Sequence, residues 1–196
     1  MENRLLKQIE FIVEVDKAKE VLRRTILLNS KRMENDAEHS WHLALMAPIL
    51  KEYIKEELDL EKVINMVIIH DLVEIDAGDT FCYDKEANKD KKNRELKAAN
   101  RIFNILPEDQ GKIIFELWKE FEEMKTIESK YANTLDRLQP IILNISNKGE
   151  SWRKNKTSKS MVLERMSIIK ETSNELWQLV LDIVEEGVKS KALQDK

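Results

Sequence analysis

Apolar residues recur along most of the chain at intervals of three and four positions, which is the spacing of one face of an α-helix. This pattern predicts a first helix from Leu5 to Leu22, with Arg23 and Arg24 following at its end. The polar run from Asn29 to Asp36 is typical of a connection. A second helix is then expected to run toward Tyr53.

A third helix is predicted from about Leu60 to Ile75, and its last part is apolar on nearly every side, which indicates a central, buried position. Gly78 is expected to end this helix, because glycine readily adopts the positive φ of a helix stop. In the second helix, Asn35 or Asp36 can form the N-cap, and Pro48 should produce a kink or mark the weakest turn.

The second half of the chain continues the helical spacing. A fourth helix is expected from Ala98 to Leu106, and Pro107 opens a fifth. A sixth should run from about Glu128 to Ile145, before a polar loop at 147–156. From about 157 to 190, the apolar positions predict one long amphipathic helix that covers the core or a dimer partner.

Composition supports the same fold class. The 196 residues include only 4 glycines and 3 prolines, which are too few for a fold rich in tight turns and hairpins. The sequence shows no internal repeat, low-complexity tract or linker that would divide it. We therefore predict an all-α fold and a single domain spanning residues 1–196.

The charge and the cysteine content of the chain limit which partners it can bind and in which cellular compartment we expect it. The 33 basic residues nearly balance 37 acidic ones, and this net charge of -4 argues against nucleic-acid binding. The N-terminus lacks the apolar core of a secretion signal, and no segment resembles a membrane span. A single cysteine, Cys82, cannot form an internal disulfide. These features predict a cytoplasmic protein that binds neither nucleic acid nor a membrane.

Histidines and acids occur together within the predicted helices. His39 and His42 are three residues apart in the second helix, and His70 adjoins Asp71 in the third. Glu74 follows Asp71 by three residues, so the side chains of His70, Asp71 and Glu74 project from one side of the helix. Burying an unpaired charge costs several kcal/mol, so the acids of this apolar helix need partners.

Asp136 in the sixth helix is a second acid in apolar surroundings. At helical spacing from it, Ala132, Pro140 and Leu143 form a largely apolar strip. An acid in such a strip would be stabilised by a cation. Two imidazoles and two carboxylates would suit manganese, cobalt, iron, nickel or zinc better than magnesium. Each residue also has a structural alternative: hydrogen bonding for the His-Asp pair, a core position for the first histidine, and an ion pair with lysine or arginine for Asp136.

Three segments together resemble the HD-domain superfamily of metal-dependent phosphohydrolases: EHSWHLALMA at 38–47, HDLVEIDAGD at 70–79, and the pair Leu135-Asp136. Their order along the chain is more specific than any one of them. The sequence is most similar to the branch that includes bacterial 5′-deoxynucleotidases and their eukaryotic relatives, from about Arg24 to Asn144. The resemblance implies an HD-domain helical bundle and leaves the long C-terminal helix outside the matched region.

The resemblance implies roles for the residues at matching positions. It makes four residues the ligands of one divalent metal ion: His39, His70, Asp71 and Asp136. Glu74 would be the acid that assists catalysis. A phosphohydrolase of this kind needs both the ion and an adjacent acid, so we treat these residues as one predicted site.

Further residues complete the predicted site. Asp79 matches an active-site acid of the same branch, which also contacts substrate. Arg24 matches the arginine that binds the substrate phosphate, and its structural alternative is a solvated helix end. His42 is not a ligand of the family, and we place it behind the ligands, where it helps to hold the phosphate. Trp41 is assigned to core packing, with a pocket wall as the alternative, and Asp76 to a loop or helix end.

Two differences from other members of the superfamily narrow the predicted reaction and the predicted number of metal ions. The chain lacks the Gly-Tyr-Pro signature of cyclic-dinucleotide phosphodiesterases, and it has no spare histidines for a second metal ion, so a one-metal site is expected. The resemblance implies a homodimer that hydrolyses (deoxy)nucleoside 5′-monophosphates to nucleoside and phosphate. The alternatives are an HD hydrolase of nucleoside di- or triphosphates or another phosphate ester, and a non-catalytic nucleotide-binding helical module.

Overall fold

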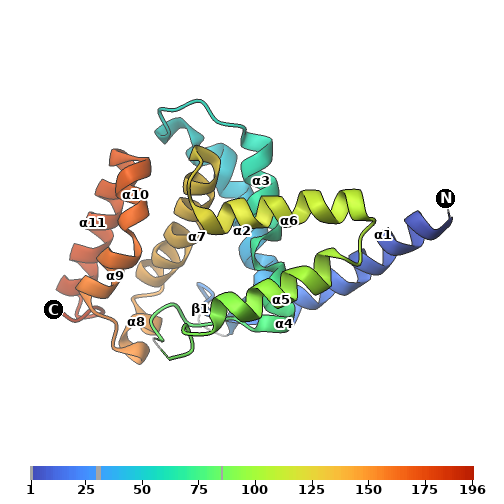
Figure 1. Cartoon of the computed structure of the whole chain (residues 1–196). Coiled ribbons are helices and arrows are strands. Elements are labelled where there is room, and N and C mark those ends of the chain that lie inside the picture. Colours follow the sequence, from blue (N-terminus) through green and yellow to red (C-terminus); the bar gives the residue numbers. More distant parts are fainter. Residues whose placement is uncertain (1, 30–31, 85) are drawn as a thin grey trace.

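Helices make up most of the structure, and a small antiparallel sheet packs among them (Figure 1). The computed structural model describes residues 2–29, 32–84 and 86–196. In chain order, with 3₁₀ helices written as η, the elements are α1 (Glu2–Val15), η1 (Asp16–Lys19), β1 (Leu22–Ile26), β2 (Met33–Asn35), α2 (Asp36–Leu50), η2 (Lys51–Tyr53), α3 (Leu60–Ile69), η3 (His70–Val73), α4 (Glu74–Ala77), α5 (Lys91–Phe103), α6 (Glu108–Glu123), α7 (Ile127–Ser146), α8 (Glu150–Asn155), α9 (Lys159–Arg165), α10 (Ser167–Thr172) and α11 (Asn174–Lys189). The all-α fold class is confirmed, with the small sheet as an addition.

The N-terminal segment differs from the predicted helix over Leu5–Leu22. Helix α1 ends at Val15, and Leu22–Ile26 form strand β1, which pairs antiparallel with β2. Val21, Thr25 and Ile26 in and beside this strand are β-branched, and such residues favour a strand once a pairing partner is available. Successive side chains of a strand point to opposite faces, so Arg23 and Arg24 diverge. Arg23 is largely buried, whereas Arg24 is exposed.

Local hydrogen bonds fix the start of α2 and with it the position of His39. The Asn35 side chain accepts a hydrogen bond from the backbone N–H of Glu38, and the Glu38 side chain accepts one from the backbone N–H of Asn35. These two bonds form a capping box. Of the two candidates in the sequence, Asn35 and Asp36, the N-cap is therefore Asn35. Pro48 lies inside the last turn, and the helix ends at Leu50.

The predicted third helix changes its geometry at the residues that carry the motif. Helix α3 ends at Ile69, His70–Val73 form the 3₁₀ turn η3, and Glu74–Ala77 form α4. A 3₁₀ turn within a helical stretch tightens the backbone and often marks a functional position. Gly78 ends α4 with a φ of 72°, as predicted. The central position of α3 is also confirmed, because its inward side chains are fully buried: Val63, Met66 and Val67.

The segment predicted as one long helix from 157 to 190 is instead divided into three helices, α9, α10 and α11. The breaks fall at Met166 and Ser173, and the Ser173 hydroxyl accepts a hydrogen bond from the backbone N–H of Leu176. A serine that caps a new helix competes with continuation of the preceding one. The predicted loop at 147–156 likewise contains the short helix α8. Helices α10 and α11 pack against α7, and α9 packs against α11 (Figure 1).

The main hydrophobic core lies between α2, α3, α7 and the C-terminal helices, and a second cluster lies between η3, α5 and α6. Tyr131 of α7 is fully buried and donates a hydrogen bond to the carbonyl oxygen of Ala47 in α2 at 2.7 Å. Trp41, predicted to pack in the core, is 67% exposed, so that prediction is wrong. Within the described ranges, no helix is both long enough and apolar enough to cross a membrane.

Candidate metal centre

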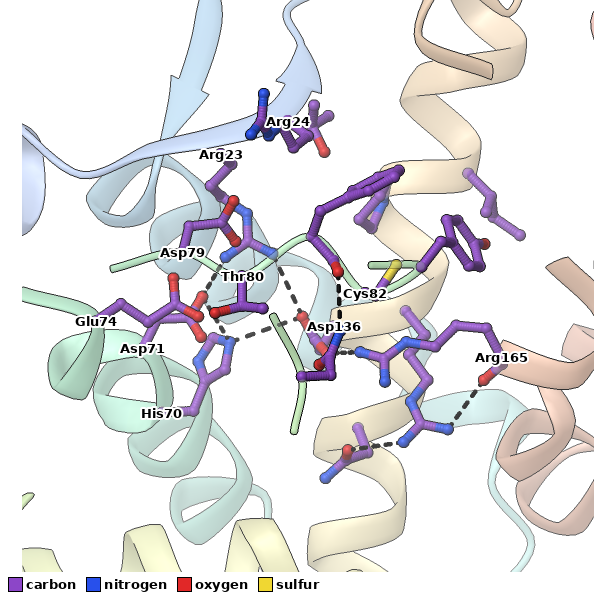
Figure 2. Close-up of a pocket in the computed structure, with 18 of the residues that line it drawn as sticks. Arg23, Arg24, His70, Asp71, Glu74, Asp79, Thr80, Cys82, Asp136 and Arg165 are labelled. Atoms are coloured by element: carbon purple, nitrogen blue, oxygen red, sulfur yellow. Dashed lines mark hydrogen bonds and ion pairs between the residues drawn. The ribbon is translucent and has the colours of Figure 1, made fainter. Parts of the chain in front are cut away.

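A cavity of about 230 Å³ opens beside α7, between β1, α4 and the C-terminal helices (Figure 2). It brings together residues that are far apart in the sequence, and most of the predicted site residues line it: Arg24, His70, Asp71, Glu74, Asp79 and Asp136. His39 is fully buried behind the cavity wall. The cavity is therefore the place where the predicted site can meet a small molecule.

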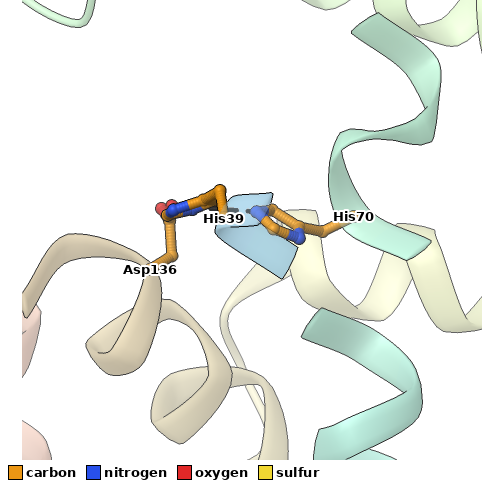
Figure 3. A group of neighbouring side chains, drawn as sticks. All are labelled: His39, His70 and Asp136. Carbon is orange, nitrogen blue, oxygen red and sulfur yellow. Dashed lines mark hydrogen bonds and ion pairs between the residues drawn. The ribbon is translucent and has the colours of Figure 1, made fainter. Parts of the chain in front are cut away.

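Two imidazoles and one carboxylate meet at the inner end of this cavity (Figure 3). The Nε2 atom of His39 in α2 lies 3.1 Å from Oδ1 of Asp136 in α7. The Nε2 atom of His70 in η3 lies 3.7 Å from the same oxygen and 3.1 Å from Oδ2 of Asp71. The structure thus brings all four predicted metal ligands together, from three elements that are distant in the sequence.

The other ring nitrogens fix how these imidazoles are oriented. Gln139 donates its amide N–H to Glu34 Oε1 at 2.6 Å, which leaves its Oε1 to accept a hydrogen bond from His39 Nδ1 at 3.2 Å. His70 Nδ1 donates to the carbonyl oxygen of Val67 at 2.9 Å. Because the Nδ1 atom of each ring is held by these acceptors, the Nε2 atom of each ring faces the carboxylates of Asp136 and Asp71.

These donors fit a divalent cation. Carboxylate oxygens and imidazole nitrogens face one another at short distance, and His70 Nε2 is buried with no hydrogen-bond partner among the described residues. His39, His70 and Asp136 form one group whose ligand atoms all lie within 4.8 Å of one another. Asp71 falls in an adjoining group with Asp36 and Glu74. A mixed set of imidazoles and carboxylates is typical of transition-metal sites.

Burial controls the protonation of the neighbouring acids. It raises the pKa of Glu74 well above its usual value, and the negative charge of Asp71 raises that pKa further. Burial also raises the pKa of Asp79. For Asp71, burial alone would raise the pKa, but the positive charges of His70 and Arg23 lower it below the usual value. Neighbouring acids whose pKa values are shifted in opposite directions thus lie side by side, an arrangement that is typical of acid–base sites.

Two predicted substrate-binding residues lie away from this inner end. Arg24 is exposed on β1 and lines the cavity, and its positive charge acts on Asp79. His42 does not line the cavity. Its Nδ1 accepts a hydrogen bond from the Gln139 amide at 3.2 Å, behind His39. The geometry therefore favours an indirect role for His42, through the residue that orients a ligand, and a contact with phosphate stays a prediction.

Sequence reasoning missed several charged residues of the cavity. Arg23 pairs with Asp71, and Arg165 from α9 places Nη2 3.7 Å from Asp136 Oδ2. The arginine at 165 lies outside the recognised motifs, and no spacing rule connects it to them. Gln139 could have been found, because it lies three residues after Asp136 and hence on the same side of the helix.

We predict that Gln139→Leu weakens the binding of Mn²⁺ by about 10–100-fold, the usual effect of removing a hydrogen-bond partner of a metal ligand. A leucine side chain cannot accept a hydrogen bond from His39 Nδ1, so the imidazole loses its fixed orientation. Isothermal titration calorimetry with Mn²⁺ measures the change. Gln178→Leu, at an exposed position of α11, serves as the matched control. Equal affinities for the two variants would contradict an orienting role for Gln139.

Comparison with known proteins places the chain in a family. Residues 15–177 match the family model of the HD domain, so the chain belongs to the HD-domain family and the resemblance noted in the sequence is confirmed. The 5'-deoxynucleotidase HDDC2 of Homo sapiens is 31% identical over 114 residues, which cover 58% of this chain and 54% of that protein. The protein of the same name from Dictyostelium discoideum is 36% identical over 114 residues, covering 56% and 60%. The chain thus matches little more than half the length of these relatives.

Solved structures agree with this family. The crystal structure of a predicted metal-dependent phosphohydrolase from Magnetospirillum magnetotacticum MS-1 is 43% identical and superposes with a TM-score of 0.94, covering 98% of this chain and 96% of that one. A conserved hypothetical protein from Pyrococcus furiosus has the same fold, with 23% identity, a TM-score of 0.63, and coverage of 91% and 99%. The helices after the motif region therefore belong to a fold that occurs in other proteins.

Proposed function

We propose that this protein is a metal-dependent phosphohydrolase that converts (deoxy)nucleoside 5′-monophosphates to nucleoside and phosphate. The observation that carries the proposal is the convergence of His39, His70 and Asp136 at the inner end of a cavity that also holds Asp71 and Glu74. The names of the relatives in the HD-domain family support the reaction class and the nucleotide substrate.

We infer that one divalent ion is held by His39, His70, Asp71 and Asp136. The donor set favours manganese, cobalt, iron, nickel or zinc, and it is less suited to magnesium. Such an ion lowers the pKa of a water molecule that it binds and neutralises charge on a phosphate oxygen.

The remaining residues would handle protons and the phosphate. Ionised Glu74 accepts a proton from the water whose oxygen forms the new bond to phosphorus, while the bond between phosphorus and the 5′ oxygen breaks. Asp79, whose pKa is raised by burial, donates a proton to the departing 5′ oxygen. Arg24, at the exposed side of the cavity, pairs with the phosphate oxygens through its guanidinium. The products are a nucleoside and inorganic phosphate.

The purified protein is expected to release orthophosphate from deoxynucleoside 5′-monophosphates when Mn²⁺ or Co²⁺ is added, because the cavity supplies both metal ligands and acids. A panel of ribo- and deoxyribonucleoside mono-, di- and triphosphates, with product analysis, measures this. Release of pyrophosphate or triphosphate would favour the alternative HD hydrolase of longer nucleotides. No release from any nucleotide, together with tight nucleotide binding, would favour a non-catalytic module.

The assembly and the location of the protein are proposed from an exposed apolar helix face and from the composition. A homodimer is supported by the apolar side of α1, which is exposed on the single chain: Leu5, Leu6, Ile9, Ile12 and Val13. Figure 1 shows that α1 extends away from the rest of the molecule, where a second copy could cover it. The single cysteine supports a cytoplasmic location, and the balanced charge supports a small-molecule substrate in place of nucleic acid.

A further inference from the structure

The guanidinium of Arg23 lies among the carboxylates of the candidate metal centre (Figure 2). Its Nη1 contacts Asp71 and lies 3.4 Å from Asp36 Oδ1, and its Nη2 lies 3.8 Å from Asp136 Oδ1. Its Nε lies 3.8 Å from Glu34 Oε2. The side chain is only 12% exposed. One largely buried cation is thus surrounded by four acids.

Two of these acids, Asp36 and Asp71, form a group with Glu74 that could itself hold a cation. The ligand oxygens of Asp36, Asp71 and Glu74 lie within 4.8 Å of one another. Glu74 Oε2 and Asp36 Oδ2 are buried and have no hydrogen-bond partner in the part of the chain that the structure describes. Asp71 also faces His70 Nε2 at 3.1 Å, so it joins this acidic group to the histidine group. Adjoining donor groups of this kind can hold two divalent ions about 3.5–4 Å apart.

We propose that Arg23 is a built-in cation that occupies the acidic group of Asp36, Asp71 and Glu74 and thereby limits the centre to one divalent ion. The inference rests on the proposed metal centre. A guanidinium is permanently charged and, unlike a bound ion, cannot dissociate, because strand β1 holds it. Its charge stabilises carboxylates that would otherwise be buried without a counter-charge. A second divalent ion in the same group would be repelled by this positive charge.

The strand that carries Arg23 explains how one side chain reaches the acids while its neighbour does not. Arg23 and Arg24 follow each other on β1, and their side chains diverge because alternate residues of a strand face opposite ways. Arg23 pairs with the buried acids, whereas Arg24 is exposed at the cavity. Two arginines that are adjacent in sequence therefore have different roles. Arg23 neutralises part of the negative charge of the metal centre, and Arg24 remains available to bind a ligand.

The test is the number of Mn²⁺ ions bound per chain, measured by native mass spectrometry and by elemental analysis of the full-length protein. The wild type is expected to bind one ion and Arg23→Gln to bind two, because the variant removes the positive guanidinium from the acidic group. Arg23→Lys keeps the charge and should bind one. Arg24→Gln, which removes the same charge from the next residue, is the matched control and should also bind one. Adding Asp36→Ala to Arg23→Gln should return the count to one.

Several outcomes would overturn the inference. It fails if Arg23→Gln binds a single ion at saturating Mn²⁺, or if Arg24→Gln gains a second ion as well. It also fails if Arg23→Gln stays unfolded at millimolar Mn²⁺, because an ion that can replace the guanidinium should restore the fold. A wild type that binds no Mn²⁺ would instead refute the proposed metal centre itself, so the two failures are distinguishable.

Discussion

Replacing Asp136 with alanine is expected to prevent metal binding and to lower phosphate release by about three orders of magnitude. A divalent ion supplies several kcal/mol of charge stabilisation in such reactions, and each 1.36 kcal/mol corresponds to about tenfold in rate. Asp136 faces both imidazoles, with Oδ1 3.1 Å from His39 Nε2 and 3.7 Å from His70 Nε2. Its loss removes the oxygen that the two histidine ligands share. Calorimetry with Mn²⁺ and a phosphate-release assay measure the two effects.

The control for this prediction is Asp182→Ala, which removes an exposed acid of α11 that lies outside the cavity. Far-ultraviolet circular dichroism establishes whether each variant keeps its helices. If Asp136→Ala folds and still binds Mn²⁺ as tightly as the control, the assignment of Asp136 as a ligand is wrong. If it binds no Mn²⁺ but retains full activity, the proposal that hydrolysis depends on the ion is wrong.

Replacing Glu74 with glutamine is expected to separate chemistry from metal binding. Glutamine keeps the size of the side chain but cannot accept the proton of the attacking water, and loss of a general base lowers kcat by about 10²–10⁴-fold. Mn²⁺ binding should be retained, because the histidine group and Asp71 remain. Glu122→Gln is the matched control: Glu122 is an acid of α6 that lines the same cavity without belonging to either donor group. A non-catalytic module would show no difference between the two variants.

The pH dependence of the wild type provides an independent test of Glu74. Burial, followed by the charge of Asp71, raises the pKa of Glu74, so kcat/KM should fall as the pH decreases through this raised value and the base becomes protonated. The residual activity of Glu74→Gln should lack this acidic limb. A raised pKa in the folded chain also means that metal-free protein loses stability as the pH rises from the ordinary value of glutamate toward the raised value. Glu74→Gln should reduce that loss in thermal unfolding measured across the same range.

Local sequence patterns predicted most of the helices and drew attention to the candidate site residues for a definable reason. Apolar residues at helical spacing identify the buried side of a helix, so a histidine or acid on that side, such as His70 or Asp136, is recognisable as an anomaly. Short-range hydrogen bonds also have local signatures, as the Asn35–Glu38 capping box and the stop at Gly78 show. The order of the motifs along the chain indicated the HD-domain family, and the family model confirms it by matching residues 15–177.

Errors arose where competing local preferences were decided by packing. The segment around Leu22 has apolar residues at helical spacing, yet it forms a strand because β2 offers hydrogen bonds that a helix end cannot use. The C-terminal segment keeps its helical spacing across Ser173, but the chain turns there so that α10 and α11 can both pack against α7. Propensity is a weak preference that tertiary contacts override.

By itself, the sequence determined the helical fold, the order of the motifs and the chemical types of the site residues, because these depend on neighbours within one or two helical turns. Only the tertiary structure decided which charges meet. The contacts of Arg23 with Asp71 and of Arg165 with Asp136 join elements that are far apart along the chain. Such pairings depend on how whole helices and strands pack, and no local spacing encodes them.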